Sequence, residues 1–297
     1  MLLRVLRALR ENLFTLILLL ITAACTKTAA THNTEINRII SAAPSNTEII
    51  VALGMGDRLI AVDKYSSGID GVPEGLPEID FFYPDTEAVI QLKPDLIISN
   101  EVNSFGVANN PFKLLGDFGI RVVQIPNSSS IEGICGDIVL IAETLGVKER
   151  GEAIVKSMRD EIKKITETHS NSADKKSVYF EISSVPTMVT FGSCVYLHEL
   201  IEIAGGINIF ADQKNWFSPS AEEIIVRNPD VIIALFYQGE DAVSEIKSRA
   251  AFRNITAIRE NRVYAIDADA ASRPSQNVIM ALMQITAALN PDYENQH

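Results

Sequence analysis

The stretch TEAVIQLKPDLIIS at residues 86–99 recurs later in the chain as AEEIIVRNPDVIIA at residues 221–234. Aligned at a constant offset, the two copies share these pairs: Glu87 and Glu222, Pro94 and Pro229, Asp95 and Asp230, Ile97 and Ile232, and Ile98 and Ile233. Each copy has the pattern of a short helix, a turn enforced by Pro-Asp and a buried strand. Because a whole unit is repeated, the sequence predicts two lobes of similar α/β plan.

Apolar runs and helical patterns alternate around the first copy. Strands are expected at residues 38–44, 58–63, 96–99 and 120–126, and helices at 45–57, 85–93, 110–119 and 130–146. Ser45 or Asn46 is the expected cap of the first helix, with Glu48 in its first turn, and Asp85 is the expected cap of the second. Unbroken apolar strands that alternate with helices indicate a parallel sheet covered on both faces.

The second half of the chain repeats this alternation. Strands are expected at residues 177–183, 231–236 and 262–267, and helices at 196–206, 220–228, 244–260 and 275–289. The predicted fold is therefore α/β, with two similar lobes of mainly parallel sheet flanked by helices and joined by one long rigid backbone helix. The expected boundaries are 36–146 for the N-terminal lobe, 147–170 for the backbone helix and 177–290 for the C-terminal lobe.

The joining segment, residues 148–168, has its own pattern. It places Ile154, Met158, Ile162 and Ile165 on one stripe and charged side chains elsewhere. This spacing predicts an amphipathic helix of about 30 Å at 1.5 Å per residue. The segment lacks Gly and Pro after Gly151, so we expect the lobes to move little relative to each other when a ligand binds.

The first 24 residues have the pattern of an export signal. Three arginines precede the apolar run LFTLILLLITAA, and Cys25 follows the two alanines that end this run. The run is shorter than a transmembrane helix needs. This arrangement predicts a bacterial lipoprotein that is cleaved before Cys25 and lipidated there, although Thr22 stands where a lipobox usually has Leu. The alternative is a plain secreted protein. Residues 25–35 would then be a polar tether, holding the exported protein to a membrane in the periplasm or at the cell surface.

Composition limits the partners. The chain has 297 residues, 47% of them hydrophobic, which suits one large or two medium domains. Its net charge of −12 argues against nucleic acid as a partner, because phosphate binding needs a basic face. Cys135 and Cys194 fall in different predicted lobes, so we expect free thiols rather than a disulfide. The protein is expected to be a monomer without a cofactor or a metal site of its own.

Five segments together resemble one known family: residues 38–66, 87–99, 197–210, 222–234 and 261–267. They are similar to the helical-backbone (class III) substrate-binding proteins of ABC importers that serve cobalamin, ferric siderophores and haem, and most closely to the vitamin B12-binding members. The resemblance covers nearly all of residues 36–290. It implies that one exposed glutamate on each lobe, here Glu87 and Glu222, docks onto arginines of a membrane permease that works with an ATPase.

The same resemblance implies an aromatic cleft between the lobes that binds a bulky metal chelate. In its vitamin B12-binding members, aromatic side chains line the cleft at the positions of Tyr65, Phe81 and Trp216; Phe81 stands where a Trp is expected. Phe82 and Tyr83 belong to the same aromatic loop, and Arg273 is a further candidate. Flat chelates need such walls. Cobalamin is therefore the favoured ligand.

Other ligands and functions stay open. Haem needs an axial His or Tyr, for which His198, Tyr65 and Tyr83 are candidates. Anionic ferric siderophores favour cations, for which Lys64, Lys214 and Arg273 are candidates. A bilobal enzyme is a different class: Asp267 and Asp269 follow a strand end, where such sites lie, but the sequence has no phosphate loop and selects no nucleophile–base pair. A surface sensor or adhesin on the same fold is the third possibility.

Overall fold

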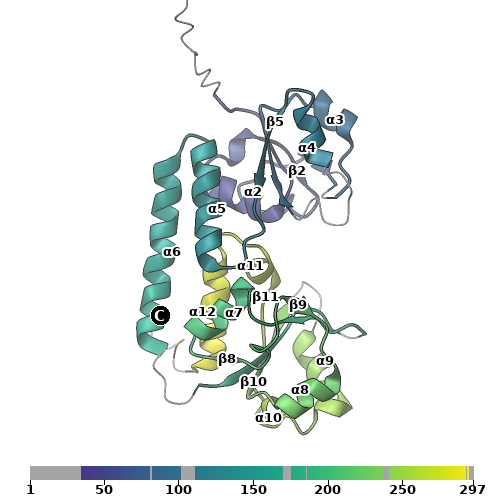
Figure 1. The fold of residues 1–297 in the computed structure, drawn as a ribbon, viewed down its shortest axis with the longest axis vertical. Coiled ribbons are helices and arrows are strands. Elements are labelled where there is room, and N and C mark those ends of the chain that lie inside the picture. Colours follow the sequence, from purple (N-terminus) through teal and green to yellow (C-terminus); the bar gives the residue numbers. More distant parts are fainter. Residues whose placement is uncertain are drawn as a thin grey trace, which may run out of the picture. The chain divides into compact units, whose positions relative to one another are not determined.

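The computed structural model describes residues 35–80, 82–101, 111–169, 175–184, 186–236, 241–291 and 293. Its main compact unit begins at Ile36. The predicted export signal, Cys25 and all of the tether except Glu35 lie outside the described residues, as does Phe81. Figure 1 shows the arrangement of the helices and strands.

The N-terminal lobe is a parallel sheet of five strands in the order β3-β2-β1-β4-β5. Its strands are β1 (Ile39–Ser41), β2 (Leu59–Asp63), β3 (Glu78–Ile79), β4 (Leu96–Asn100) and β5 (Arg121–Ile125). Its helices are α2 (Pro44–Ala52), α3 (Thr86–Gln91), α4 (Pro111–Gly116) and α5 (Ile131–Thr144), with the short 3-10 helix η1 (Gly56–Arg58). Apolar side chains of α3 and α4 belong to the core on one face, and those of α2 and α5 to the core on the other.

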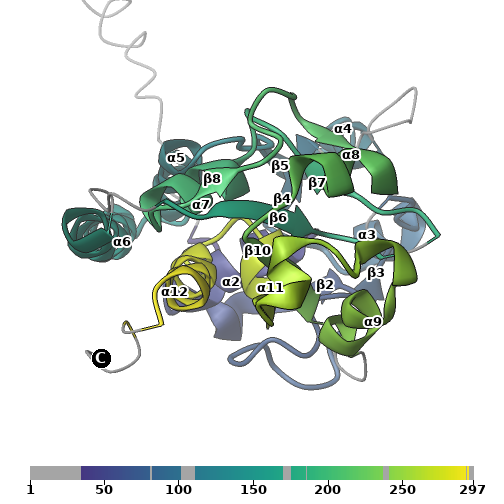
Figure 2. The same cartoon turned by 90° about the horizontal axis from the view of Figure 1, so that it is seen from below.

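The C-terminal lobe has a parallel sheet in the order β11-β10-β6-β8 and an antiparallel pair, β7-β9. The strands are β6 (Ser177–Glu181), β7 (Thr190–Phe191), β8 (Ile207–Asn208), β9 (Trp216–Phe217), β10 (Val231–Phe236) and β11 (Val263–Asp267). The helices are α7 (Tyr196–Ile203), α8 (Ala221–Arg227), α9 (Ala242–Ser248), η3 (Ala250–Phe252), α10 (Thr256–Arg259), α11 (Ala268–Ser272) and α12 (Val278–Leu289). Figure 2 shows α7 and α12 on one side of this sheet, and α8 and α9 on the other.

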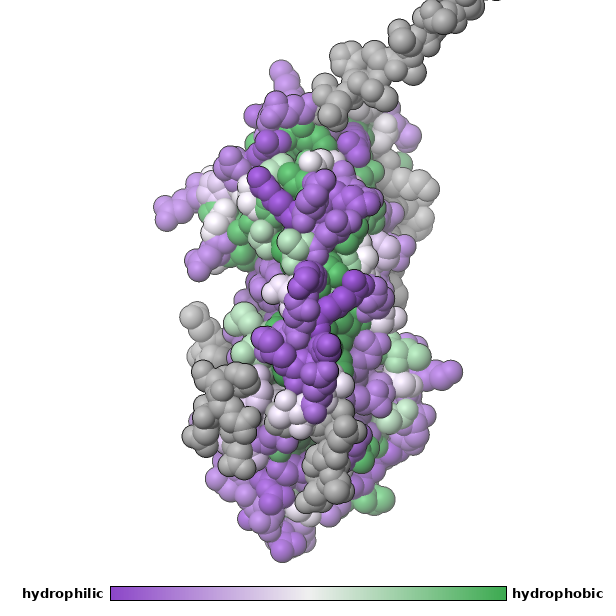
Figure 3. All heavy atoms as spheres, turned by 90° about the vertical axis from the view of Figure 1, so that its left-hand side faces the viewer, coloured by the Kyte–Doolittle hydropathy of each residue, from purple (hydrophilic) through white to green (hydrophobic). Residues whose placement is uncertain are grey.

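Helix α6 (Lys148–His169) follows α5 and packs against α5, α7 and α12, so it contacts both lobes. Val155, Met158 and Ile165 are buried in a core that continues from the N-terminal into the C-terminal lobe. Figure 3 views the molecule from the α6 side and shows a mainly hydrophilic band there. The predicted fold class, two α/β lobes joined by a long helix, is confirmed.

The repeated sequence folds into the same local structure in both lobes. Asp95 Oδ2 accepts hydrogen bonds from the backbone N–H groups of Asn37 and Arg38, both at 3.0 Å. Asp230 Oδ2 accepts from the N–H of Ser177 at 2.9 Å and from its hydroxyl at 2.7 Å. Each aspartate therefore ties the start of its own strand to the start of the neighbouring strand. This contact gives the repeated Pro-Asp a structural role.

Some sequence predictions of local structure were wrong. Helix α2 begins at Pro44, and its N-cap is Ala43 without a side-chain hydrogen bond, so neither Ser45 nor Asn46 caps it and Glu48 is not in its first turn. Proline is favourable at the first helical position because its missing N–H would be unpaired there. The helix expected at 244–260 is broken into α9, η3 and α10. The short elements β3, β7, β8, β9 and α11 were not predicted.

Candidate functional site

The turn after β2 presents Tyr65. Asp63 is fully buried; its Oδ1 accepts the Tyr65 N–H at 2.9 Å and its Oδ2 accepts the Ser66 hydroxyl. Burial raises the pKa of Asp63, and the hydrogen bond from Ser66 opposes this. The Asp63 carboxyl group thus fixes the turn on its buried side, while the Tyr65 side chain stays 55% exposed. Such an arrangement fixes the backbone that carries an aromatic group and leaves its ring available to a ligand.

A second exposed aromatic pair follows β3. Asp80 Oδ1 accepts the backbone N–H groups of Phe82 at 2.8 Å and Tyr83 at 2.7 Å. These two hydrogen bonds lower the pKa of Asp80, because they favour its charged form. Lys64 lies 3.8 Å from Asp80 and 5.1 Å from the centre of the Tyr65 ring, so it connects the two turns. Tyr65, Phe82 and Tyr83 are therefore exposed on a loop region that is fixed by polar contacts.

Trp216 belongs to the C-terminal lobe. It starts β9, which pairs with β7, and its ring packs edge-on against Phe191 at 5.5 Å between centroids. The backbone at Gly192 lies against the backbone at Gln213. A Cβ atom at Gly192 would lie 2.2 Å from the Gln213 carbonyl oxygen, so only glycine fits there. Trp216 nevertheless remains 48% exposed. Its position is therefore fixed by the β7–β9 ribbon, with one side of the ring free.

A cavity of about 420 Å³ adjoins Trp216 and is lined from both lobes. The loop after β5 contributes one wall and the C-terminal lobe contributes the other. The side chains that line it within the described part of the chain are all uncharged: Asn127, Ser128, Ser129, Cys194, Val195, Tyr196, Asn215, Trp216, Ser272 and Pro274. The volume lies within the range of small-molecule sites, and the lining combines one large aromatic face with hydroxyl and amide groups. This cavity can hold a neutral ligand that carries polar substituents.

The loop wall of this cavity is backed by a buried carboxyl group. The Ser128 hydroxyl donates to Asp137 Oδ2 at 2.6 Å. Burial raises the pKa of Asp137 to about 6, and the nearby charge of Glu101 adds to the effect. Sequence reasoning missed Asp137 and the 127–129 loop, because an isolated Asp on an amphipathic helix gives no signal of what it faces.

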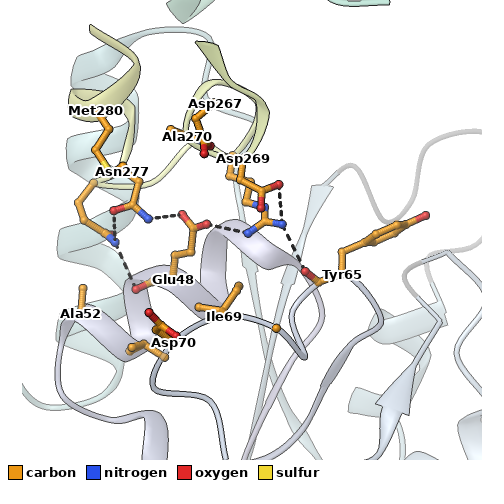
Figure 4. A pocket seen from close by; sticks show the side chains of 14 residues that line it. Glu48, Ala52, Tyr65, Ile69, Asp70, Asp267, Asp269, Ala270, Asn277 and Met280 are labelled. Carbon is orange, nitrogen blue, oxygen red and sulfur yellow. Dashed lines mark hydrogen bonds and ion pairs between the residues drawn. The ribbon is translucent and has the colours of Figure 1, made fainter. Parts of the chain in front are cut away.

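A second cavity, of about 520 Å³, lies between α2, the 65–70 turn and residues 267–280. Figure 4 shows Glu48 there, bonded across the two lobes, with the Tyr65 ring pointing away from it. Glu48 accepts hydrogen bonds from Arg273 Nη1 at 3.0 Å, Asn277 Nδ2 at 2.9 Å and the Ser275 hydroxyl. We call this group, Glu48 with Arg273, Ser275 and Asn277, the interlobe latch.

The interlobe latch also reaches the aromatic turn. Arg273 Nη2 lies 3.4 Å from the Tyr65 carbonyl oxygen and 2.8 Å from Asp269. Glu48 is only 5% exposed, and burial raises its pKa although its hydrogen bonds oppose the shift. The structure thus places Arg273 in contacts with its own chain, and its role toward a ligand stays a prediction. The latch could not be found from sequence, because its two halves are 225 or more residues apart.

The two repeated glutamates lie on exposed helix starts. The helix caps are made by other residues: Asp85 accepts the N–H groups of Glu87 and Ala88, while Ser220 and Glu223 form a reciprocal capping box. Within the described ranges, neither the Glu87 nor the Glu222 carboxylate has a hydrogen-bond or ion-pair partner. Both carboxylates are therefore available to an outside partner, since capping does not engage them.

The remaining candidates have contacts within the chain. His198 is largely buried on α7, 3.5 Å from Asn208 and 3.6 Å from Glu202. Asp267 caps α11, and Asp269 pairs with Arg273. Cys135 is buried, Cys194 is exposed and both are free. No cluster of three or more His, Cys, Asp or Glu side chains placed to hold a metal ion occurs among the described residues.

Comparison with known proteins identifies the family. The model of the periplasmic binding protein family matches residues 39–270. The chain belongs to this family. The predicted resemblance is thereby confirmed, and the cavities described above lie at the positions where two lobes of such a binding protein approach each other.

Individual relatives agree with this assignment. The chain is 30% identical to the ABC transporter substrate-binding lipoprotein YvrC of Bacillus subtilis, over 87% of this chain and 81% of the relative. It is 26% identical to the vitamin B12-binding protein of Vibrio parahaemolyticus, over 85% and 89%. A solved structure of a possible iron-binding periplasmic solute-binding protein from Staphylococcus epidermidis has a TM-score of 0.76 and 30% identity, covering 86% of this chain and 99% of that one.

The helices that the structure describes include none that is both long enough and apolar enough to cross a membrane. Attachment through Cys25 lies outside the described residues and stays a prediction.

Proposed function

We propose that this protein is the substrate-binding component of an ABC importer and captures a bulky, neutral metal chelate, cobalamin in the first place. The observation that carries the choice of ligand is the uncharged lining of the cavity beside Trp216, which has room for one edge of such a chelate. A corrinoid presents a flat ring edged with amides. Such a ligand matches an aromatic face surrounded by hydroxyl and amide groups.

The alternative ligands find less support in these contacts. A ferric siderophore is anionic. Of the three candidate cations, Lys64 is paired with Asp80 and Arg273 with Glu48 and Asp269, while Lys214 has no ion pair within the described residues. Haem needs an axial ligand, and His198 is held on α7 by Asn208 and Glu202. Tyr65 and Tyr83 stay available for that role. Ferric-siderophore or haem binding on the same scaffold is therefore the second candidate, and the similarity to a protein described as a possible iron-binding protein supports it.

Delivery to the membrane forms the second part of the proposal. Glu87 and Glu222 are the two docking glutamates, one on each lobe, and they contact basic residues of the importer's permease. Paired charge-assisted contacts on two lobes fix orientation as well as attraction. A lipid on Cys25 would hold the protein, as a monomer, near that permease in the periplasm or at the cell surface. An enzyme is not proposed, because Asp267 and Asp269 serve a helix cap and an ion pair.

Intrinsic fluorescence tests the ligand assignment, because Trp216 is the single tryptophan of the chain. We expect cyanocobalamin to quench it with a dissociation constant below about 1 μM, the affinity of a specific site. Trp216→Phe should weaken binding measured by calorimetry about tenfold, whereas Phe118→Ala, at an exposed aromatic on another surface, should leave it unchanged. Binding of haemin or a ferric siderophore without binding of cobalamin would contradict the ligand assignment.

A labelling experiment tests the anchor. Labelled palmitate should enter the wild-type protein expressed in its host and should not enter Cys25→Ala. Equal labelling of both, or of neither, would exclude the lipoprotein assignment and leave a secreted protein.

A further inference from the structure

Helix α8 presents an apolar surface beside its docking glutamate. Ile225 is 36% exposed and Val226 is 83% exposed, and they follow Glu222 by three and four residues. Side chains with this spacing lie on one face of a helix. Ile224, which is fully buried in the core of the C-terminal lobe, points to the other side. The outer face of α8 therefore combines a free carboxylate with two exposed aliphatic groups.

The equivalent face of α3 is different. There the positions that follow Glu87 hold Ile90, which packs partly into the core of the N-terminal lobe, and Gln91, which is polar and exposed. The two lobes therefore offer different surfaces to a partner, although their glutamates are equivalent. A single exposed aliphatic residue needs no explanation. Two of them adjoining an unpaired carboxylate on one face have the composition of an interface, an apolar area bordered by charge.

We propose that Ile225 and Val226 make an apolar contact with the membrane permease of the importer, next to the contact of Glu222. The permease is the occupant because the carboxylate on the same helix face is one of the two docking glutamates; the inference rests on that proposed function and deepens it. The C-terminal lobe is then held by apolar burial as well as charge, and the N-terminal lobe mainly by charge.

The two kinds of contact differ in their response to salt. Exposed charge pairs weaken as ionic strength rises, because the Debye length falls to about 8 Å at 0.15 M and about 3 Å at 1 M. Burial of apolar surface is not screened in this way. The permease affinity that remains at high salt should therefore depend on Ile225 and Val226.

The experiment measures binding of the full-length protein to the purified permease–ATPase complex in nanodiscs, at low and high salt. We expect Val226→Ser to weaken binding about tenfold at both salt concentrations, the loss expected when a buried aliphatic side chain is replaced by a small polar one. Ile225→Ser should act in the same direction. Glu222→Ala should weaken binding more at low salt than at high salt.

Two matched controls separate position from chemistry. Gln91→Ser, at the equivalent position of α3, should change the affinity by less than about twofold. Leu140→Ser replaces an aliphatic residue on α5 that is 37% exposed, close to the value for Ile225, and should have no effect. Thermal unfolding of each variant should match the wild type, because Val226 contributes little to the core.

The outcomes distinguish the two proposals. If Glu222→Ala weakens binding while Val226→Ser and Ile225→Ser bind like the wild type, the apolar contact is wrong and the docking role of Glu222 stands. If the two serine variants weaken binding and Glu222→Ala does not, the apolar contact stands and the docking role of Glu222 is wrong. If none of these three variants changes binding, both proposals are overturned.

Discussion

The two copies of the helix–turn–strand unit, residues 85–100 and 220–235, agree inside the protein and differ on its surface. Both place a fully buried aliphatic residue in the helix, Val89 and Ile224. Both bend through a left-handed residue before Pro-Asp, with φ of 47° at Lys93 and 44° at Asn228. On the surface, α3 has Gln91 at the position where α8 has Val226. The shared interior reflects what a parallel strand needs at its start, and the difference in surface is the basis of the proposed apolar contact of α8.

Two buried carboxyl groups, one in each lobe, have different partners. Glu181 of the C-terminal lobe is paired with Arg249 at 2.7 Å, whereas Asp137 of the N-terminal lobe is bonded to the Ser128 hydroxyl. Burial raises the pKa of Asp137, and the hydrogen bond from Ser128 offsets this only in part.

The largest effect is expected at the interlobe latch. Glu48→Ala should lower the free energy of unfolding by about 3 kcal/mol, because it leaves the Arg273 guanidinium buried with fewer partners. Urea unfolding followed by circular dichroism measures this. A control variant, Glu149→Ala on the exposed side of α6, should change it by less than about 0.5 kcal/mol. A loss for Glu48→Ala no larger than that of the control would show that the latch does not join the lobes.

The next largest loss in the free energy of unfolding is expected when the hydrogen bonds of the two Pro-Asp turns are removed. Asp230→Ala should cost about 2 to 3 kcal/mol and Asp95→Ala about 1 to 2 kcal/mol, because each removes two hydrogen bonds to a charged acceptor. Asp230 is half-buried while Asp95 is exposed, so the larger loss belongs to the C-terminal copy. Asp117→Ala, at an exposed turn, is the control. Equal losses in the two copies would contradict the dependence on burial.

Asp137 gives a pH-dependent difference between the lobes. Its pKa is raised to about 6 from an ordinary 3.8, so the folded protein retains a proton that the unfolded chain releases. Stability from this group therefore falls as the pH rises from about 4 to about 6, and levels off above that. Asp137→Asn should be more stable than the wild type at pH 7 by about 1 to 2 kcal/mol and equal to it below pH 4. An advantage that does not change with pH would contradict the assignment.

The smallest effect is expected at Lys93, the left-handed residue of the N-terminal copy. Lys93→Asn should raise stability by about 0.5 kcal/mol, because Asn tolerates this backbone conformation better than Lys does. The reverse exchange, Asn228→Lys, should cost about 1 to 2 kcal/mol, because the Asn228 side chain also accepts the Thr256 N–H at 2.9 Å. Calorimetric unfolding measures both variants. A gain from Asn228→Lys would contradict both the backbone preference and the stabilising role of the Thr256 contact.

Much of this fold could be predicted from sequence, because the buried strands are unbroken apolar runs and several helices begin with a capping residue. Asp85 and Ser220 mark the starts of α3 and α8, and the apolar stripe of α6 indicates a long amphipathic helix. The two-residue strands β3, β7, β8 and β9 could not be predicted, since they depend on neighbours distant in the chain. The start of α2 was misplaced because Pro44 was interpreted as ending a strand rather than beginning a helix.

The site was predicted less completely than the fold. Tyr65, Trp216 and the docking glutamates lie in exposed positions, as a role in binding requires. The interlobe latch, the Ser128–Asp137 pair and the uncharged lining of the cavity beside Trp216 had no local signal. Each brings together residues from separate segments, so only the packing of the chain makes them neighbours.

The central claim is that one glutamate on each lobe docks this protein onto its permease. The most direct test is complex formation between the purified permease–ATPase complex in nanodiscs and Glu87→Ala, Glu222→Ala and the double variant, at low salt. Each single change should weaken binding about tenfold and the double change more, as expected for the loss of charge-assisted contacts. Ligand affinity and unfolding should stay almost unchanged. A double variant that binds the permease like the wild type would contradict the account.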